Sequence, residues 1–370
     1  MQAYIPCPLP PNPPLVPTST DYDLMERANR ALGRLDGISA LLPNVDLFIY
    51  TYVRKEAVLS SQIEGTQSSL SDLLLHENSA APGLPTKDVD ELINYVAAMN
   101  HGLSRIAKGF PLSLRLLREI HCVLMQGMRG KDKNPGEFRR VQNWLGAGQP
   151  RDAVFVPPPP QHLMACLDPF ERFLHGQPEP TPLLIKAALA HVQFETIHPF
   201  LDGNGRLGRL LITLLLCAEK ALSQPLLYLS LFFKKNRSEY YERLQNVRVE
   251  GAWEAWLRFF LRGVLETAES GVQSATRLLQ ASNEHEALLT TLGRRALSAI
   301  QVLKAMKRRP VATVGSLAND TGLSPPTVAS SLARMTELNL IREVTGRQRD
   351  RVFAYWPYLD ILSEGTEPLR

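Results

Sequence analysis

One short stretch of the chain carries residue types that could handle phosphate. Residues 198–209 read His-Pro-Phe-Leu-Asp-Gly-Asn-Gly-Arg-Leu-Gly-Arg. Gly203 and Gly205 can turn successive backbone N–H groups toward an anion, and a helix that follows them adds its N-terminal dipole. Arg206 and Arg209 are three residues apart, so both guanidinium groups can hold phosphate oxygens on one side of the first helical turn. The stretch therefore predicts a phosphate site.

Two more side chains of this stretch could supply chemistry. Asp202 offers a hard oxygen ligand, which suits a Mg²⁺ ion that a nucleotide also holds. His198 titrates near neutrality, so it can take a proton from a nucleophile. A connector between two apolar helices could use proline and glycine only to turn the chain. That simpler explanation does not account for the histidine, the aspartate and two arginines within twelve residues.

Residues 198–209 resemble the signature of Fic (filamentation induced by cyclic AMP) proteins, His-Pro-Phe-x-Asp-Gly-Asn-Gly-Arg-x-x-Arg, at every defining position. The resemblance implies a mainly α-helical catalytic domain that transfers AMP from ATP to a hydroxyl side chain of a target protein. It implies that His198 is the general base toward Ser, Thr or Tyr, and that Asp202 binds Mg²⁺ between the α- and β-phosphates. It places Arg206 on the β-phosphate side and Arg209 on the γ-phosphate. The implied ATP-binding residues of the stretch are Gly203, Asn204, Gly205, Arg206, Leu207, Gly208 and Arg209.

The family also has an asparagine and a tyrosine near the nucleotide, farther along the chain. Asn236 and Tyr240 follow the segment Leu226–Phe233 and stand in the corresponding place. Their assignment to the ATP site comes from the resemblance alone. A tyrosine here could equally lie at the edge of the core.

A second motif lies upstream. Residues 60–65, Ser-Ser-Gln-Ile-Glu-Gly, resemble the Fic inhibitory motif Ser/Thr-x-x-x-Glu-Gly/Asn. A serine and a glutamate four apart occur on many solvated helices, but the pattern gains specificity beside residues 198–209. The resemblance assigns Ser60, Glu64 and Gly65 to an N-terminal inhibitory helix. If Glu64 pairs with Arg209, that arginine cannot hold the γ-phosphate, and ATP binds weakly or unproductively.

Residues 136–160 contain scattered glycines and aromatic residues and end in four prolines. We predict a β-hairpin flap here, with one arm at 139–145 and the other at 153–156. The resemblance implies that an extended segment of the target protein pairs with this flap as an added strand. The alternative is a covering loop that binds nothing.

Helical periodicity and capping residues predict the elements that position these motifs. Asp21 is a candidate cap of the first helix, and Ser69 with Asp72 is a candidate start of a short one. The other predicted helices cover 45–60, 86–105, 112–128, 164–174, 183–197, 205–221, 237–248 and 252–288.

Residues 294–356 resemble a winged helix-turn-helix. Ser324 and Pro325 are typical of the start of its third helix, Pro325–Leu338, and 341–344 and 352–355 are predicted strands. This third helix is expected to turn Thr327, Ser330, Ser331 and Arg334 outward. The wing carries Arg342, Arg347, Arg349 and Arg351, which could meet DNA phosphates. The alternative is a protein–protein or dimerisation module.

Composition limits the remaining classes. The 370 residues are 44% hydrophobic and carry a net charge of +4, so the chain can bury a large core and is no histone-like tail. The four cysteines show no metal or disulfide spacing, and no secretory signal is visible. The longest apolar run, 210–218, is far shorter than the ~20 residues that span a bilayer. We expect a cytoplasmic protein without a membrane segment, with a homodimer possible.

The resulting prediction is a mainly α protein of three parts: a Pro-rich arm and inhibitory segment (1–85), a Fic domain with a small hairpin flap (86–290) and a winged-helix domain (291–370). The predicted function is autoinhibited transfer of AMP from ATP to target proteins, with self-modification. One alternative is a DNA-binding regulator whose Fic core senses nucleotides, but a sensor needs no general base such as His198. The same site could also remove AMP from modified targets, or use UMP, phosphate or phosphocholine donors.

Overall fold

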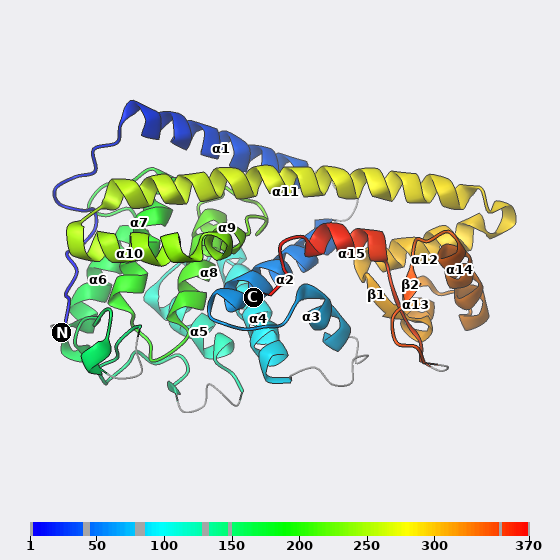
Figure 1. Cartoon of the computed structure of the whole chain (residues 1–370), viewed down its shortest axis with the longest axis horizontal. Helices are drawn as coiled ribbons and strands as arrows, with labels where there is room; N and C mark the ends of the chain where they lie inside the picture. Colours follow the sequence, from blue (N-terminus) through cyan, green and yellow to red (C-terminus); the bar gives the residue numbers. More distant parts are fainter. Residues whose placement is uncertain are drawn as a thin grey trace.

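The computed structural model describes residues 3–39, 45–77, 86–127, 133–146, 150–347 and 350–368. The fold is mainly α-helical with one small antiparallel sheet, which confirms the predicted fold class (Figure 1). The buried side chains form one continuous hydrophobic cluster from the first helix to the last. The division at residues 85 and 290 stays a prediction.

The α-helices are α1 Ser19–Ser39, α2 Val45–Ile63, α3 Leu70–Glu77, α4 Thr86–Ala107, α5 Leu114–Leu124, α6 Leu163–Leu174, α7 Leu183–Ile197, α8 Asn204–Ala218, α9 Ser230–Lys235, α10 Arg237–Glu250, α11 Trp253–Thr290, α12 Ala296–Arg308, α13 Val314–Thr321, α14 Pro325–Glu337 and α15 Trp356–Ser363. The strands are β1 Val311–Thr313, β2 Arg342–Glu343 and β3 Val352–Ala354, and the short 3₁₀ helices are η2 Pro150–Asp152, η3 Pro160–His162 and η4 Gly293–Arg295.

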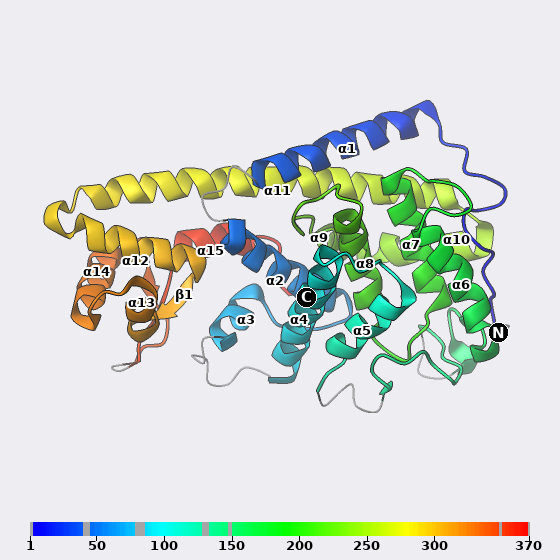
Figure 2. The ribbon, with the colours of Figure 1, turned by 180° about the vertical axis from the view of Figure 1, so that it is seen from behind.

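Helix α11 runs the length of the molecule, and α1 lies along it (Figures 1 and 2). The first turn of α1 is closed by Thr18, whose backbone N–H and hydroxyl both donate to Asp21 Oδ2 at 2.8 Å. The sequence suggested Asp21 as the cap before the helix. Asp21 instead lies inside the first turn of α1, which begins at Ser19. Its other oxygen accepts a 2.7 Å hydrogen bond from Arg258, which ties α1 to α11.

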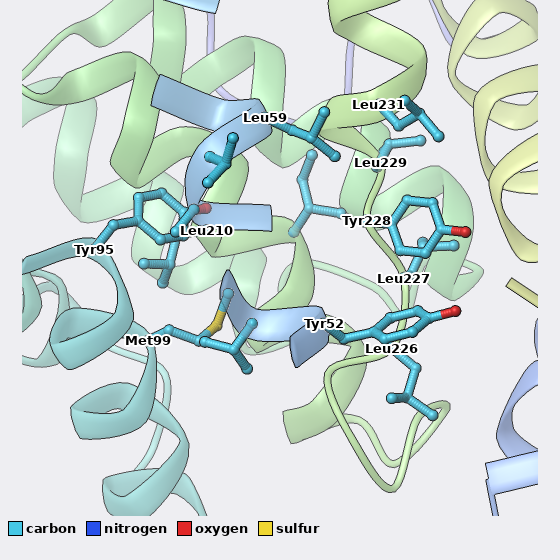
Figure 3. Packing of buried hydrophobic residues seen from close by; sticks show 14 of the residues in the cluster. Tyr52, Leu59, Tyr95, Met99, Leu210, Leu226, Leu227, Tyr228, Leu229 and Leu231 are labelled. Atoms are coloured by element: carbon cyan, nitrogen blue, oxygen red, sulfur yellow. The ribbon is translucent and has the colours of Figure 1, made fainter. Parts of the chain in front are cut away.

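Helix α2 is a central helix of the core. Figure 3 shows Tyr52 and Leu59 of α2 between Tyr95 of α4 and the segment that carries Tyr228. The rings of Tyr52 and Tyr228 lie 5.0 Å apart. The helix extends beyond the predicted end at Ser60 to Ile63, so Ser60 is helical and Glu64 starts the turn that follows.

In the described residues, the two predicted arms of the flap pair through a single antiparallel bridge between Leu145 and Phe155, so the hairpin is shorter than predicted. Proline has no N–H to donate to a sheet, and residues 157–160 are all proline. The buried Arg139 organises the segment instead, because its guanidinium donates to the carbonyl oxygens of Pro158 and His198, the latter at 2.9 Å.

The Pro-rich N-terminal arm lies against this region. Its Tyr4 N–H donates to the Val156 carbonyl oxygen at 2.9 Å. Farther along, Gln193 of α7 donates to the Cys7 carbonyl oxygen at 2.9 Å, and Leu9 is buried. The arm therefore packs against α7 and the segment that contains Val156.

The C-terminal part has helices α12, α13 and α14 and a sheet of order β1-β3-β2. Strand β1 had no clear signal in the sequence. The predicted cap is confirmed, since the Ser324 hydroxyl accepts the Thr327 N–H. One predicted surface residue is wrong: Ser331 is 5% exposed and packs against α12. No helix of the described residues is long and apolar enough to cross a membrane.

Candidate active site

The motif stretch forms a tight turn between α7 and α8. His198 ends α7 in the left-handed region with φ 49°, and Gly203 precedes α8 with φ 76°. Asn204 holds the turn closed: its side-chain oxygen accepts the Phe200 N–H and its amide donates to the Phe200 carbonyl oxygen, both at 2.9 Å. The turn is thus preorganised by its own residues.

His121 of α5 contacts the turn through a hydrogen bond and a ring stack. Its Nδ1 accepts the Gly136 N–H at 2.9 Å, so its Nε2 carries the proton and donates to the Asp202 carbonyl oxygen at 3.0 Å. Its ring stacks on Phe200 at 3.8 Å between centroids. Burial lowers the pKa of His121 to about 4, so the ring is neutral at physiological pH. Phe200 is a core residue, as the sequence suggested.

A cavity of about 520 Å³ opens above the turn. That size is within the range of small-molecule sites. Its wall contains His198, Asp202, Gly203, Asn204, Gly205 and Arg206 from the motif, together with Glu64 and residues of α4, α5 and the flap. The structure therefore brings the two sequence motifs into one cavity.

Asp202 and Arg206 lie together at the start of α8. The Asp202 side chain is 49% exposed to the cavity, 3.7 Å from the Arg206 guanidinium. Arg206 is buried and its other terminal nitrogen lies 3.5 Å from Glu91 of α4. The described residues contain no group of three or more histidine, cysteine or acidic side chains that could hold a metal alone. Mg²⁺ is usually held by one or two carboxylates plus substrate phosphates, so the single carboxylate of Asp202 fits that ion.

Arg209 is 2% exposed, and its guanidinium donates hydrogen bonds to two residues of the inhibitory motif. Its Nε donates to the Ser60 hydroxyl at 2.8 Å, and its Nη2 donates to the Ser60 carbonyl oxygen at 2.9 Å and to Glu64 Oε1 at 2.7 Å. Burial disfavours the Glu64 carboxylate, but the Arg209 charge and hydrogen bond outweigh it and lower the pKa of Glu64. The predicted Glu64–Arg209 pair is therefore present and ionised.

Gly205 makes this contact possible. A Cβ at this position would lie 2.3 Å from Glu64 Oε1 and 3.2 Å from an Arg209 nitrogen. Only glycine leaves room for the carboxylate against the first turn of α8. Gly65, the last residue of the inhibitory motif, has φ 103° and turns the chain away after Glu64.

His198 reaches the same cavity from the other side. Its Nδ1 lies 3.3 Å from the Glu195 carbonyl oxygen, and its side chain is 12% exposed. A proton on Nδ1 that points at this carbonyl leaves Nε2 as the basic nitrogen. Burial, followed by the positive charge of Arg248, lowers the pKa of His198 to about 3. The imidazole is thus neutral and able to accept a proton.

The remaining predicted ATP-binding residues lie deeper. Leu207 is fully buried in the core, and a Cβ on Gly208 would meet Glu195 Oε1 at 2.4 Å. Tyr240 is 1% exposed and its hydroxyl bonds His191 Nε2 at 2.9 Å. The Asn236 amide donates to the Phe232 carbonyl oxygen at 3.0 Å. None of these four lines the cavity, so their role in ATP binding stays a prediction.

Sequence reasoning missed several residues of the cavity wall, and Glu91, Asn94 and Met125 are polar or contact Arg206. Glu91 and Asn94 come from α4, and Met125 from the end of α5, with its sulfur 3.7 Å from an Arg206 nitrogen. All three lie outside any motif on ordinary amphipathic helices. Only the packing of α4 and α5 on α8 brings them to the site.

Family comparisons agree with this geometry. Residues 22–104 match the model described as Fic/DOC family N-terminal, and residues 111–216 match that of the Fic/DOC family. Together these matches cover about half of the chain, and the chain belongs to the Fic/DOC family. Residues 298–343 match a bacterial regulatory protein model of the arsR family.

Curated relatives are named protein adenylyltransferase Fic. The one from Culex quinquefasciatus is 28% identical over 64% of this chain and 45% of its own length. The one from Drosophila erecta is 30% identical over 53% of this chain and 37% of its own length. The chain thus matches less than half the length of these two relatives.

Solved structures share the fold. A Fic family protein from Desulfovibrio desulfuricans G20 aligns with a TM-score of 0.61 at 20% identity, over 92% of this chain and 97% of that one. A Fic domain containing signaling protein from Bacteroides thetaiotaomicron aligns with a TM-score of 0.53 at 18% identity, over 68% of this chain and 97% of that one.

Proposed function

We propose that this protein is an autoinhibited adenylyltransferase that transfers AMP from ATP to a Ser, Thr or Tyr hydroxyl of target proteins and of itself. The observation that carries the proposal is the single cavity lined by His198, Asp202 and Arg206, with Arg209 immediately behind it under Glu64. The names of the curated relatives support the same reaction.

In the proposed reaction, His198 Nε2 accepts the proton of the target hydroxyl. The hydroxyl oxygen then forms a bond to the α-phosphorus of ATP, and the bond from that phosphorus to the bridging oxygen breaks. The products are the AMP ester of the target and pyrophosphate. The neutral state of His198 and its fixed Nδ1 orientation support this role. A positioned base typically accelerates a reaction about 10²–10⁴-fold.

The phosphates would lie over the turn and the start of α8. The backbone of Gly203, Asn204 and Gly205 and the side chain of Arg206 would offset their negative charge, which grows on the leaving pyrophosphate. Mg²⁺, held by Asp202 and phosphate oxygens, would neutralise the same charge. In this structure Arg209 donates hydrogen bonds to Ser60 and Glu64, so it would not be available to the γ-phosphate.

We further propose that the target docks on the flap, residues 136–160. The supporting observation is a pair of exposed apolar side chains: Val141 is 59% and Val154 is 54% exposed. Leu145, which lies between them in the chain, reaches the wall of the cavity. An extended target segment on these residues would lie close to His198.

A second candidate function is favoured by the arsR-family match. In this proposal the winged-helix domain binds DNA through α14 and the wing, and the Fic core reports nucleotide binding to it. A duplex-DNA mobility shift that weakens steeply with salt would support it. Self-modification that depends on His198 would favour the enzyme instead. The four free cysteines support a cytoplasmic location for either function.

The test of the main proposal is incubation with Mg²⁺ and α-labelled ATP, and in separate reactions with UTP or CDP-choline as donor, followed by mass spectrometry of the modified protein. His198→Ala should abolish AMP transfer and leave ATP binding intact, because the phosphate contacts lie on other residues. The control is His162→Ala, which removes an exposed histidine of η3. Transfer by His198→Ala at the parental rate would refute the assignment of the base. UMP, phosphate or phosphocholine on the product would identify a different donor.

A further inference from the structure

The end of the chain returns to the inhibitory motif. After β3, helix α15 packs on α11, α2 and α3, and the residues that follow it turn toward the C-terminal end of α2 (Figures 1 and 2). We call residues 364–367 the C-terminal segment. It is more than 150 residues away in sequence from the catalytic turn, and none of its residues lines the catalytic cavity.

The first anchor of the C-terminal segment is inside the inhibitory motif. Gln62 lies between Ser60 and Glu64 and is 1% exposed. Its amide donates to the Thr366 carbonyl oxygen at 2.8 Å and to the Ser68 carbonyl oxygen at 3.0 Å. A buried amide that lost such a partner would leave a polar group unsatisfied. The segment therefore stabilises the end of α2, which Glu64 directly follows.

The second anchor is electrostatic. Lys234 of α9 is buried, and its ammonium donates to the carbonyl oxygens of Gly365 and Glu367. Lys55 of α2 is also buried: burial lowers its pKa to about 8, and the negative charges of Glu364 and Glu367 oppose that shift. The segment thus places carbonyl oxygens beside the buried Lys234 and negative charge near the buried Lys55.

The C-terminal segment packs closely against α9. Gly365 has φ 81°, and a Cβ there would lie 2.6 Å from Leu231 Cδ1 of α9. Thr366 is 2% exposed, and its N–H and hydroxyl both bond the Ser363 carbonyl oxygen. A segment buried in this way is part of the structure around α2 and not a loose end.

From these contacts we infer that the C-terminal segment is a latch that holds the end of α2 in place, so that Glu64 stays on Arg209 and AMP transfer stays low. Release of the latch leaves Ser60 and Glu64 free to move off Arg209, and transfer rises. The inference rests on the proposed function. Because α15 joins the latch directly to β3, it also links the winged-helix domain to the catalytic site.

Two full-length variants test the latch. Gly365→Ala adds a methyl group against Leu231 in a strained backbone region, and Lys234→Met removes the ammonium that holds two carbonyl oxygens. Each should raise the initial rate of self-modification with α-labelled ATP roughly tenfold, the effect expected from losing one or two hydrogen bonds to a charged or buried group. Hydrogen exchange of backbone amides in residues 60–68 should become faster in both variants.

Gly346→Ala is the matched control. This glycine also has positive φ, 62°, but a Cβ there meets nothing within 4 Å. It should leave transfer unchanged. A merely structural role of the segment would lower transfer in Gly365→Ala, so a rise separates the two explanations. Should Gly365→Ala fail to fold, Lys234→Met carries the test.

Glu64→Gly distinguishes the failure of the latch from the failure of autoinhibition. If Glu64→Gly raises transfer and both latch variants match the parent, the latch is refuted and autoinhibition stands. If Glu64→Gly has no effect either, the proposed inhibition fails and the latch with it. If the latch acts through Glu64, adding Gly365→Ala to Glu64→Gly gives no further rise. A further rise of similar size in the double variant would refute the inference that the latch acts through Glu64.

Discussion

Removal of one carboxylate should activate this protein, which is an unusual direction for a substitution in an active site. Glu64→Gly takes away the Oε1 that accepts a 2.7 Å hydrogen bond from Arg209. It leaves His198, Asp202 and the turn unchanged, and Arg209 keeps its two contacts with Ser60. The capacity of Arg209 Nη2 that Glu64 used would then be open to the γ-phosphate of ATP, the partner that we propose for it.

The size of the effect follows from the burial of the pair. Arg209 is 2% exposed and Glu64 is 41% exposed, so the pair is neither a surface salt bridge nor a fully buried one. Exposed pairs contribute about 0.2–1 kcal/mol, and breaking a fully buried one costs about 3–5 kcal/mol. We therefore take about 1–3 kcal/mol for this pair, which corresponds to a gain of roughly 5- to 150-fold in transfer.

The assay measures the initial rate of AMP incorporation from α-labelled ATP, into the protein itself and into added target, together with ATP affinity by calorimetry. Both should rise in Glu64→Gly. Glu77→Gly is the control, since Glu77 ends α3 and its 2.8 Å salt bridge goes to Arg54, away from Arg209. It should leave the rate unchanged.

Equal rates for the parent and Glu64→Gly, with self-modification measured, would refute the inhibitory role of Glu64. The double variant with Arg209→Ala should lose the gain, because both substitutions act on one contact. A gain that persists without Arg209 would show that Glu64 acts through another group. Loss of an AMP-removing activity in Glu64→Gly, measured on a modified target, would make Glu64 a residue of that reverse reaction.

Two further predictions concern the metal and the base. Asp202→Ala should lower transfer and raise the Mg²⁺ concentration needed for half of the maximal rate, and an unchanged Mg²⁺ titration would refute the ligand assignment. Because burial lowers the pKa of His198 to about 3, the base is unprotonated above that value and is lost only as the pH falls through it. The rate at saturating ATP should therefore stay level from pH 8 down to about 5.5, and half-loss at pH 6.5 or above would contradict a neutral, buried base.

The sequence predicted the residues of the turn better than it predicted the residues that surround the turn. The motif at 198–209 is local, because Gly203, Asn204 and the helix start that they form act within a few residues of one another. The Glu64–Arg209 pair joins residues far apart in the chain, and it was predictable only because both motifs resemble those of one family. Capping at Ser324 was predictable for the same local reason as the turn.

Other features needed tertiary structure. The flap was predicted as a hairpin with arms at 139–145 and 153–156, but only Leu145 and Phe155 pair. The prolines at 157–160 cannot extend the pairing, and Arg139 holds that stretch of chain through its bond to the Pro158 carbonyl oxygen. Ser331 was placed outside because serine is polar, whereas the packing of α14 on α12 buries it. Glu91, Asn94 and the residues of the C-terminal segment carry no local signal at all.

In the proposed autoinhibition, Glu64 and the γ-phosphate of ATP compete for one side chain, Arg209. Glu64 accepts a hydrogen bond from Arg209 Nη2, the group that the γ-phosphate would need. Ser60 accepts from Nε and Nη2 and would hold the guanidinium in position for either anion. The turn is already closed while Glu64 bonds Arg209, so activation in this proposal requires no refolding of the turn. It requires only that the balance between the two anions shift by about 1–3 kcal/mol, which is within the reach of a few hydrogen bonds. Contacts at Gln62, two residues from Glu64, are therefore large enough to set that balance.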